Sequence, residues 1–318
     1  MSNENKTARR LEHFVAPFDI NTLAPVDAPR VESKPANLWS DAWRDIRRRP
    51  MFWISAFILL LVAAVALFPG LFTQADPRYC DNKLSRAPAG GSSLLGYTMG
   101  GCDIFARIIH GTSTSISVGV ITVAITLIVG VIFGALAGFF GGFVDTLLSR
   151  IGDIFFSVPY MLAAIVVMSV LASHRNVWVI SLALGGFAWP STARILRAEI
   201  LRVRSQDFVL AAKAIGLSRI GILIKHVLPN SIAPVIVITT LALAGAIVGE
   251  SALSFLGLGL PDQFLSWGNE ISKAQERMRT DPHLLLYPSL ALIITVLGFI
   301  MMGEVVRDAL DPKARARR

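Results

Sequence analysis

Side chains capable of catalysis or metal binding are scattered along this sequence rather than grouped. Serine, aspartate and histidine residues lie in separate segments, so none suggests a nucleophile with its base. The phosphate-binding pattern G-x-x-x-x-G-K-[ST] is absent. The histidines show no paired spacing typical of metal ligands; they are His13, His110, His174, His226 and His283. We therefore expect no catalytic residue, metal site or bound cofactor in this chain.

Glu250 stands out because it lies inside an apolar run that begins near residue 231. A carboxylate at the centre of a membrane helix costs roughly 2.5–3.5 kcal/mol and usually faces the interior of the helix bundle. Two interpretations stay open. Glu250 lines or gates a pathway, or it is a structural carboxylate that hydrogen-bonds neighbouring helices.

The composition indicates an integral membrane protein. Of the 318 residues, 53% are hydrophobic and 16% charged, whereas soluble domains contain about 25% charged residues. This composition is therefore atypical of a soluble enzyme, a disordered chain or a coiled coil. Six apolar runs are long enough to cross about 30 Å of hydrocarbon as helices, and they cover residues 51–72, 116–140, 154–173, 177–196, 231–256 and 284–304. We predict an all-α membrane protein with six transmembrane helices.

Proline and glycine residues modify these helices. Pro159 and Pro190 should kink the third and fourth spans without ending them. Gly130, Gly134 and Gly138 recur every four residues in the second span. This spacing permits close approach of another helix, although glycine is also generally frequent in membrane helices.

The basic residues predict the orientation. With the N-terminus in the cytoplasm, 22 of the 30 lysine and arginine residues lie on the cytoplasmic side, as membrane proteins generally require. The C-terminus is then cytoplasmic too. This distribution explains the net charge of +8 without nucleic acid. The expected organisation is a polar cytoplasmic extension, a first helix, an extracytoplasmic loop, a transmembrane core and a basic cytoplasmic tail, at residues 1–50, 51–72, 73–115, 116–304 and 305–318.

Cys80 and Cys102 are the only cysteines, and both fall in the expected extracytoplasmic loop. Disulfides persist in oxidising compartments. We therefore favour a Cys80–Cys102 bridge over two free thiols.

The longest cytoplasmic loop, residues 197–230, is expected to contain a helix over 199–215, a break at Gly216 and a second short helix over 217–227 that Pro229 stops. An apolar surface should remain, formed by Leu210, Ile215, Leu217, Ile220 and Leu223. This surface lies on lipid headgroups, or it docks into a groove of a cytoplasmic partner.

Leu210-Ala211-Ala212, Gly216 with the following Leu217, and Leu228-Pro229 resemble the EAA loop of ABC-importer permeases, in which Glu-Ala-Ala is followed by a glycine and then by Ile-x-Leu-Pro. Two positions depart from the pattern. Leu210 replaces its glutamate, and His226 replaces its isoleucine. The resemblance assigns this loop to coupling with an ATPase, although a salt bridge from position 210 is not available.

Further segments resemble the dipeptide/oligopeptide branch of these permeases, in particular the second type of subunit, which carries a cytoplasmic N-terminal extension. They include residues 95–97, 101–107, 110–111, 250–259, 267–268 and 307–312, in the same order as in the family. The resemblance runs from about residue 38 to 313.

The resemblance implies a multi-pass subunit of the bacterial plasma membrane that has no catalysis of its own. A second homologous permease would complete the pathway, two cytoplasmic ABC ATPases would use ATP and Mg²⁺, and an extracytoplasmic substrate-binding protein would deliver di- or oligopeptides. Alternatives are a permease of this family for a non-peptide solute such as a nickel chelate, an ATP-independent secondary transporter, and a membrane scaffold or sensor.

Overall fold

The computed structural model describes residues 38–90 and 93–310. Most of the expected N-terminal extension and the end of the expected basic tail therefore lie outside the described residues. The chain divides into two units after Asp41. The described part of the first unit is the beginning of helix α1 (Leu38–Ile46). The second unit contains all the features discussed below.

Helices dominate the described residues, which contain isolated bridges but no strand. The longer helices are α2 (Pro50–Leu67), α3 (Ile104–Phe140), α4 (Gly142–Ser157), α5 (Tyr160–Val170), α6 (Val177–Val203), α10 (Ala233–Phe255), α11 (Trp267–Gln275) and α12 (His283–Leu310). Between α6 and α10 lie α7 (Asp207–Ala214), α8 (Arg219–Ile222), a π-helical turn (Leu223–Val227) and α9 (Leu228–Ser231). Short 3₁₀ turns cover Pro69–Leu71, Asn82–Leu84 and Ala172–His174.

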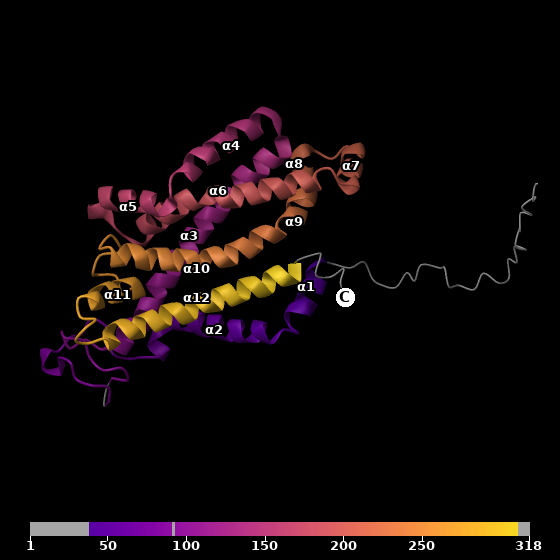
Figure 1. Ribbon diagram of the computed structural model, residues 1–318. Coiled ribbons are helices and arrows are strands. Elements are labelled where there is room, and N and C mark those ends of the chain that lie inside the picture. Colours follow the sequence, from indigo (N-terminus) through magenta and orange to yellow (C-terminus); the bar gives the residue numbers. More distant parts are fainter. Residues whose placement is uncertain (1–37, 91–92, 311–318) are drawn as a thin grey trace, which may run out of the picture. The chain divides into compact units, whose positions relative to one another are not determined.

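Five of the described helices are long and apolar enough to cross a membrane: α2, α3, α6, α10 and α12. The pair α4 and α5 makes a sixth if it is counted as one broken span. α6 is the most buried of the five and α2 the least. Figure 1 shows α5 and α11 at one end of the second unit and α7 and α8 at the other. We call these the α11 end and the α7 end.

Helix α3 begins well before the apolar run that predicted it. The Asp103 side chain accepts a hydrogen bond from the backbone N–H of Ala106, and this N-cap starts the helix at Ile104. Residues 104–115 were expected in a loop because polar residues such as Thr112 and Ser115 interrupt their hydropathy. Both of these side chains are buried inside the bundle.

The third expected span is broken rather than kinked. α4 ends at Ser157 and α5 starts at Tyr160, with an angle of 77° between them. Pro159 has no N–H to donate, and it holds Val158 in an extended conformation, so the helix stops. The expectation that Pro159 would not end the helix was therefore wrong. Pro190 does lie inside a continuous helix, α6.

Close packing of α3 against α6 explains the regular glycines of the second span. A methyl group added to Gly134 would lie 2.6 Å from the carbonyl oxygen of Ala193, and one added to Gly130 would lie 2.7 Å from Cβ of Thr192. On α6, a methyl group on Gly185 would lie 2.7 Å from the carbonyl oxygen of Thr122. The glycines thus let two backbones approach more closely than side chains would allow.

Candidate functional site

Residues 207–231, which we call the α7–α9 segment, form a folded unit at the α7 end. Its buried side chains include Val209, Ala212, Ile222 and Val227, and they pack into one apolar cluster with residues of α3, α6 and α10. Arg204 precedes the segment and donates a hydrogen bond of 3.0 Å to the carbonyl oxygen of Gly138, at the end of α3. The segment is therefore packed directly onto the spanning helices.

Gly216 reverses the chain between α7 and α8. Its φ of +82° lies in the left-handed region that favours glycine. The N–H of Gly216 donates to the carbonyl of Lys213 at 3.0 Å, and that of Leu217 donates to the carbonyl of Ala212 at 3.2 Å. These two bonds form the Schellman motif that closes a helix. Ser218 then caps α8 by accepting a bond from the N–H of Gly221.

The opposite face of the α7–α9 segment exposes large aliphatic side chains. Leu210 is 52% exposed and Ile215 is 77% exposed, and Leu217 and Ile220 are exposed beside them. Leu223 was expected on this surface but is buried in the core, because it shares the core-facing side of this helical stretch with Ile222 and Val227. Ile224 is exposed instead. The surface is thus apolar and lacks a partner among the described residues.

The remaining residues of the predicted motif divide between the two faces. Ala211 and Pro229 are exposed, Ala212 is buried and Leu228 is half-buried. Pro229 was expected to stop the second short helix, but the helical path continues through it. It lies in the first turn of α9, where a helix does not use the missing N–H.

Glu250 lies in α10 and is fully buried, with 0% exposure. Its carboxylate accepts hydrogen bonds from Ser266 at 2.9 Å, Ser254 at 3.0 Å, Ser115 at 3.4 Å and Ser251 at 3.5 Å. These hydroxyls come from α3, from α10 itself and from the N-cap of α11. Glu250 therefore joins three elements at the α11 end.

The Trp267-Gly268 pair packs tightly onto this carboxylate. The Trp267 N–H donates to the hydroxyl of Ser115 at 3.1 Å, and its indole N–H donates to the carbonyl of Ile108 at 3.2 Å. A methyl group on Gly268 would lie 2.7 Å from Cα of Ser251 and 3.0 Å from Oε1 of Glu250. Any larger residue would push α11 away from α10.

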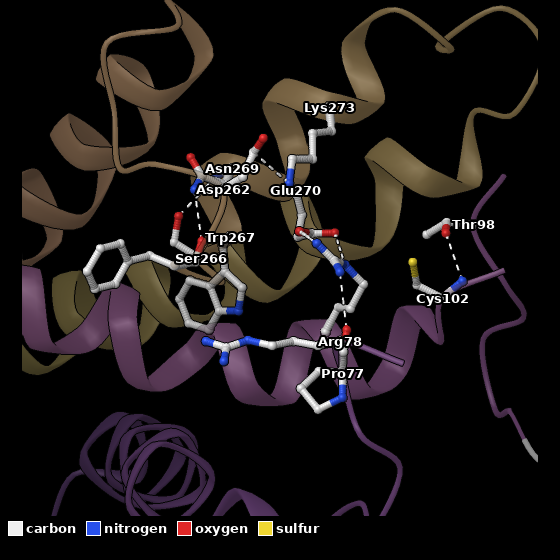
Figure 2. Close-up of polar contacts among 12 residues, drawn as sticks. Pro77, Arg78, Thr98, Cys102, Asp262, Ser266, Trp267, Asn269, Glu270 and Lys273 are labelled. Atoms are coloured by element: carbon white, nitrogen blue, oxygen red, sulfur yellow. Dashed lines mark hydrogen bonds and ion pairs between the residues drawn. The ribbon is translucent and has the colours of Figure 1, made fainter. Parts of the chain in front are cut away.

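Arg107 and Glu270 form a second connection at this end. Both side chains are nearly buried, at 11% and 12% exposure, and two nitrogens of the guanidinium donate to the carboxylate at 2.6 and 2.8 Å. A third nitrogen donates to the carbonyl of Pro77 at 3.2 Å. Figure 2 shows Pro77, Glu270 and the Lys273–Asp262 ion pair in this region. α3, α11 and the loop before α3 are thereby held together.

A disulfide joins Cys80 to Cys102 in the loop that precedes α3. The same loop meets the segment around α11 through Arg78, which donates to the carbonyl of Gln263 at 3.0 Å, and through the Arg86–Asp281 ion pair at 3.3 Å. The disulfide therefore staples a loop that covers the α11 end.

Ion pairs between α4 and α6 were not predicted from the sequence. Asp145 accepts two hydrogen bonds from Arg197. Asp153 accepts one from Arg194 at 2.8 Å, and that guanidinium also lies over the ring of Phe156. The sequence does show polar residues on one face of this otherwise apolar stretch. The arginine partners of the two aspartates could not be inferred from it, because they lie 41 and 52 residues away along the chain.

Arg49 connects the start of α2 to the end of α12. It bonds Asp308 at 2.6 Å and Asp45 at 2.9 Å. Partial burial lowers the pKa of Arg49, but the hydrogen bonds and charges of Asp308 and Asp45 outweigh this effect and raise its pKa. Among the described residues, no three histidine, cysteine, aspartate or glutamate side chains converge as metal ligands would.

Comparison with known proteins identifies the architecture. Residues 130–316 match the family described as binding-protein-dependent transport system inner membrane component. The chain belongs to this family. Residues 37–88 also match the N-terminal transmembrane domain of oligopeptide transport permease C. The protein is thus a peptide-type ABC-importer permease of the inner membrane, as the motif resemblance predicted, and neither a secondary transporter nor a scaffold.

Named relatives agree with this assignment. The glutathione transport system permease protein GsiD of Shigella flexneri serotype 5b (strain 8401) is 38% identical over 279 residues, which cover 87% of this permease and 91% of the relative. GsiD of Escherichia coli O6:K15:H31 (strain 536 / UPEC) is 36% identical over the same length. A chain of the inward-facing MetNI methionine ABC transporter has a similar fold, with a TM-score of 0.53 and 17% identity over 64% of this permease and 96% of that chain.

Proposed function

We propose that this permease forms half of the translocation pathway of an ATP-driven importer for short peptides. A second homologous permease supplies the other half, two cytoplasmic ABC ATPases hydrolyse ATP with Mg²⁺, and an extracytoplasmic binding protein delivers the cargo. The α7 end faces the cytoplasm in this proposal, and both termini lie on that side. The charge distribution along the sequence supports this orientation.

The observation that carries the proposal is the two-faced α7–α9 segment. One face is packed against α3, α6 and α10, and the other exposes Leu210, Ile215 and Ile220. An apolar helix surface of this kind fits a hydrophobic groove on a partner. Docking on the ATPase would transmit its movements directly to the spanning helices.

Position 210 limits the nature of that contact. The family pattern has a glutamate there, whereas this chain exposes the side chain of Leu210. Docking therefore depends on buried apolar area, with Lys213 and Arg219 as nearby exposed cations. We infer that the ATPase groove is apolar opposite Leu210.

Glu250 is proposed to close the outer end of the pathway. Its hydrogen bonds to Ser115, Ser254 and Ser266 fasten α11 onto α3 and α10. The carboxylate is fully enclosed, so this role is one of holding helices together rather than of contacting cargo in this conformation. Release of α11 would open the outer end.

The proposed cargo is a short peptide. Membership in the peptide-type branch supports this assignment, and the two GsiD relatives are named for glutathione, which is itself a tripeptide. The alternative cargo is a non-peptide solute such as a nickel chelate. The uptake experiment in liposomes distinguishes the two.

Reconstitution tests the proposal. The permease is purified from its own membranes with the proteins that accompany it, placed in liposomes and supplied with its binding protein. We expect a second permease and two ATPases in the complex, and uptake of radiolabelled trialanine only when ATP and Mg²⁺ are present. Uptake without ATP, or uptake of a nickel chelate but of no peptide, would contradict it.

A further inference from the structure

Three consecutive arginines precede α2, and the fold uses the guanidinium of only the last one. Arg49 pairs with Asp45 at 2.9 Å and with Asp308 at 2.6 Å, so it holds the start of α2 to the end of α12. Arg47 and Arg48 are exposed, and neither guanidinium pairs with a carboxylate among the described residues. Two cations are therefore available to a ligand.

These arginines lie where spanning helices end together. Residues 42–53 join α1 to α2, and we call them the α1–α2 corner. Ile46 of this corner packs in one apolar cluster with Ala309, near the end of α12, and with Ala233, at the start of α10. α2 itself begins at Pro50. Because α2, α10 and α12 are each long and apolar enough to span the hydrocarbon, their common end marks a surface of the membrane.

Three aromatic rings form a row on the α1–α2 corner. The ring centroids of Trp43 and Phe52 are 5.8 Å apart, and those of Phe52 and Trp53 are 5.2 Å apart. The indole N–H of Trp53 donates to the backbone carbonyl of Arg47 at 3.0 Å, which fixes this ring beside the arginines. Trp43 is 56% exposed and Trp53 61%. Exposed indole rings are typical of the headgroup level of a bilayer, because they combine an apolar body with a polar N–H.

The outer side of α2 continues from Trp53 as an apolar stripe. Phe57, Leu60 and Leu67 lie on the same side of the helix as Trp53, and they are 69%, 70% and 71% exposed. α2 is also the least buried of the five candidate spans. An acyl chain fits this stripe, and the arginines that precede it in the chain then lie at the level of the lipid phosphates.

We propose that Arg47 and Arg48 bind the phosphate of an anionic phospholipid, whose acyl chains lie along the outer side of α2. Guanidinium groups match phosphate oxygens in geometry and keep their charge at physiological pH. A net-negative headgroup is preferred over a zwitterionic one, because the ammonium of the latter offsets the charge of its phosphate. The inference requires only that the permease lies in the membrane, and it holds for any cargo.

The second permease is the other candidate to cover this side of α2. Protein interfaces are depleted of charged residues at their centre. The α1–α2 corner instead combines two cations that lack a carboxylate with two exposed tryptophans. This combination fits a phospholipid headgroup and its boundary with the acyl chains.

The test uses the permease purified in detergent from its own membranes with the proteins that accompany it. Native mass spectrometry counts the dioctanoyl-phosphatidylglycerol that stays bound during a titration, and dioctanoyl-phosphatidylcholine is the zwitterionic comparison. Wild type should bind phosphatidylglycerol more tightly than phosphatidylcholine. The double variant Arg47→Gln, Arg48→Gln should bind phosphatidylglycerol about thirtyfold more weakly, which is about fivefold for each cation lost at a membrane surface. Its binding of phosphatidylcholine should not change.

Two further double variants separate headgroup binding from general effects. Arg277 and Arg279, in the loop after α11, are also exposed and make no ion pair among the described residues. Arg277→Gln with Arg279→Gln removes the same charge at the other end of the permease and should leave the tightest site intact. Arg47→Lys with Arg48→Lys keeps the charge and should retain most of the binding, since lysine also binds phosphate as a point charge.

Equal affinity of wild type for the two lipids would overturn the proposal, as would unchanged phosphatidylglycerol binding after both arginines are replaced by glutamine. Binding that falls as far with lysine as with glutamine would also overturn it, because the effect would then be structural. Loss of the second permease with unchanged lipid binding would assign the corner to a subunit interface. Displacement of the lipid by glycerol 3-phosphate at equal concentration would assign it to a soluble phosphate, because the acyl chains would then contribute nothing.

Discussion

Glu250 illustrates how one side chain can organise a membrane protein. A buried carboxylate is costly unless hydrogen bonds replace its hydration. Here serine hydroxyls from three elements surround it, and Gly268 allows α11 to approach it closely. The residue therefore specifies one arrangement of α3, α10 and α11.

Substitution of Glu250 should separate its structural contribution from its proposed gating. Glu250→Ala leaves a cavity and several serine hydroxyls without their acceptor, so we expect a loss of stability of about 2–4 kcal/mol. Glu250→Gln keeps the shape and one acceptor, so its loss should be smaller. Thermal unfolding of the purified permease measures both, with Ser251→Ala, which removes the longest of the four contacts, as control.

The gating role predicts a further effect of Glu250→Gln. A weaker hold on α11 should raise the ATPase activity of the assembled importer in the absence of binding protein. Unchanged basal activity together with reduced stability would leave Glu250 as a structural residue only. If Glu250→Ala were as stable as wild type, the serine hydroxyls around Glu250 would not stabilise the permease.

For individual residues, the sequence indicated which side chains are unusual in a membrane protein, but not which residues they contact. Glu250, Cys80 and Cys102 were noticeable because charges and cysteines are rare in this chain. The Arg107–Glu270 pair was not predicted, because its members lie 163 residues apart and each appears in a polar segment.

Among the elements, the α7–α9 segment depends most on a single backbone conformation. The left-handed φ at Gly216 turns the chain so that α8 returns its buried residues, such as Ile222, to the core. A methyl group on Gly216 would meet no atom within 4 Å. Substitutions there act through the backbone, not through a clash.

Gly216→Val should therefore disrupt coupling without preventing insertion. A β-branched residue is strained at positive φ, by about 1 kcal/mol or more, and would tilt α8 and the exposed surface beside it. We expect normal membrane levels, with loss of cargo uptake and of stimulated ATPase activity. Asparagine tolerates this conformation, so Gly216→Asn should retain most activity. Normal uptake by the valine variant would show that the segment does not couple hydrolysis to transport.

The expected helices differed in how far hydropathy could define them. The runs at 177–196, 231–256 and 284–304 lie within or overlap α6, α10 and α12, since apolar composition and helical structure coincide there. Hydropathy did not reveal the start of α3, because buried polar side chains there face other helices. It also did not reveal most of α4, whose Asp145 and Asp153 pair with arginines of α6. Polar residues that are satisfied by tertiary contacts look like loop residues in a sequence.

Across the whole molecule, the two ends of the second unit differ in chemistry. The α11 end has a disulfide-bonded loop fastened by Arg78 and Arg107 to the α11 region. The α7 end has the exposed apolar surface of the α7–α9 segment. This asymmetry suits a permease that receives cargo through one face and ATP-driven movement through the other. The sequence predicted it from charge and cysteine placement, but it could not predict that both ends would be anchored to α3.

Cysteine labelling tests this orientation directly. Both native cysteines are joined in a disulfide, so single cysteines can be introduced into the otherwise unchanged permease. Ser218 at the α7 end and Gln275 in α11 are exposed. A thiol reagent that cannot cross the plasma membrane should label Gln275→Cys in intact cells, and Ser218→Cys only after permeabilisation. Wild-type permease should stay unlabelled in both conditions, because a disulfide does not react with a thiol-alkylating reagent. Labelling of Ser218→Cys in intact cells would invert the orientation and place the α7–α9 segment out of reach of any cytoplasmic ATPase.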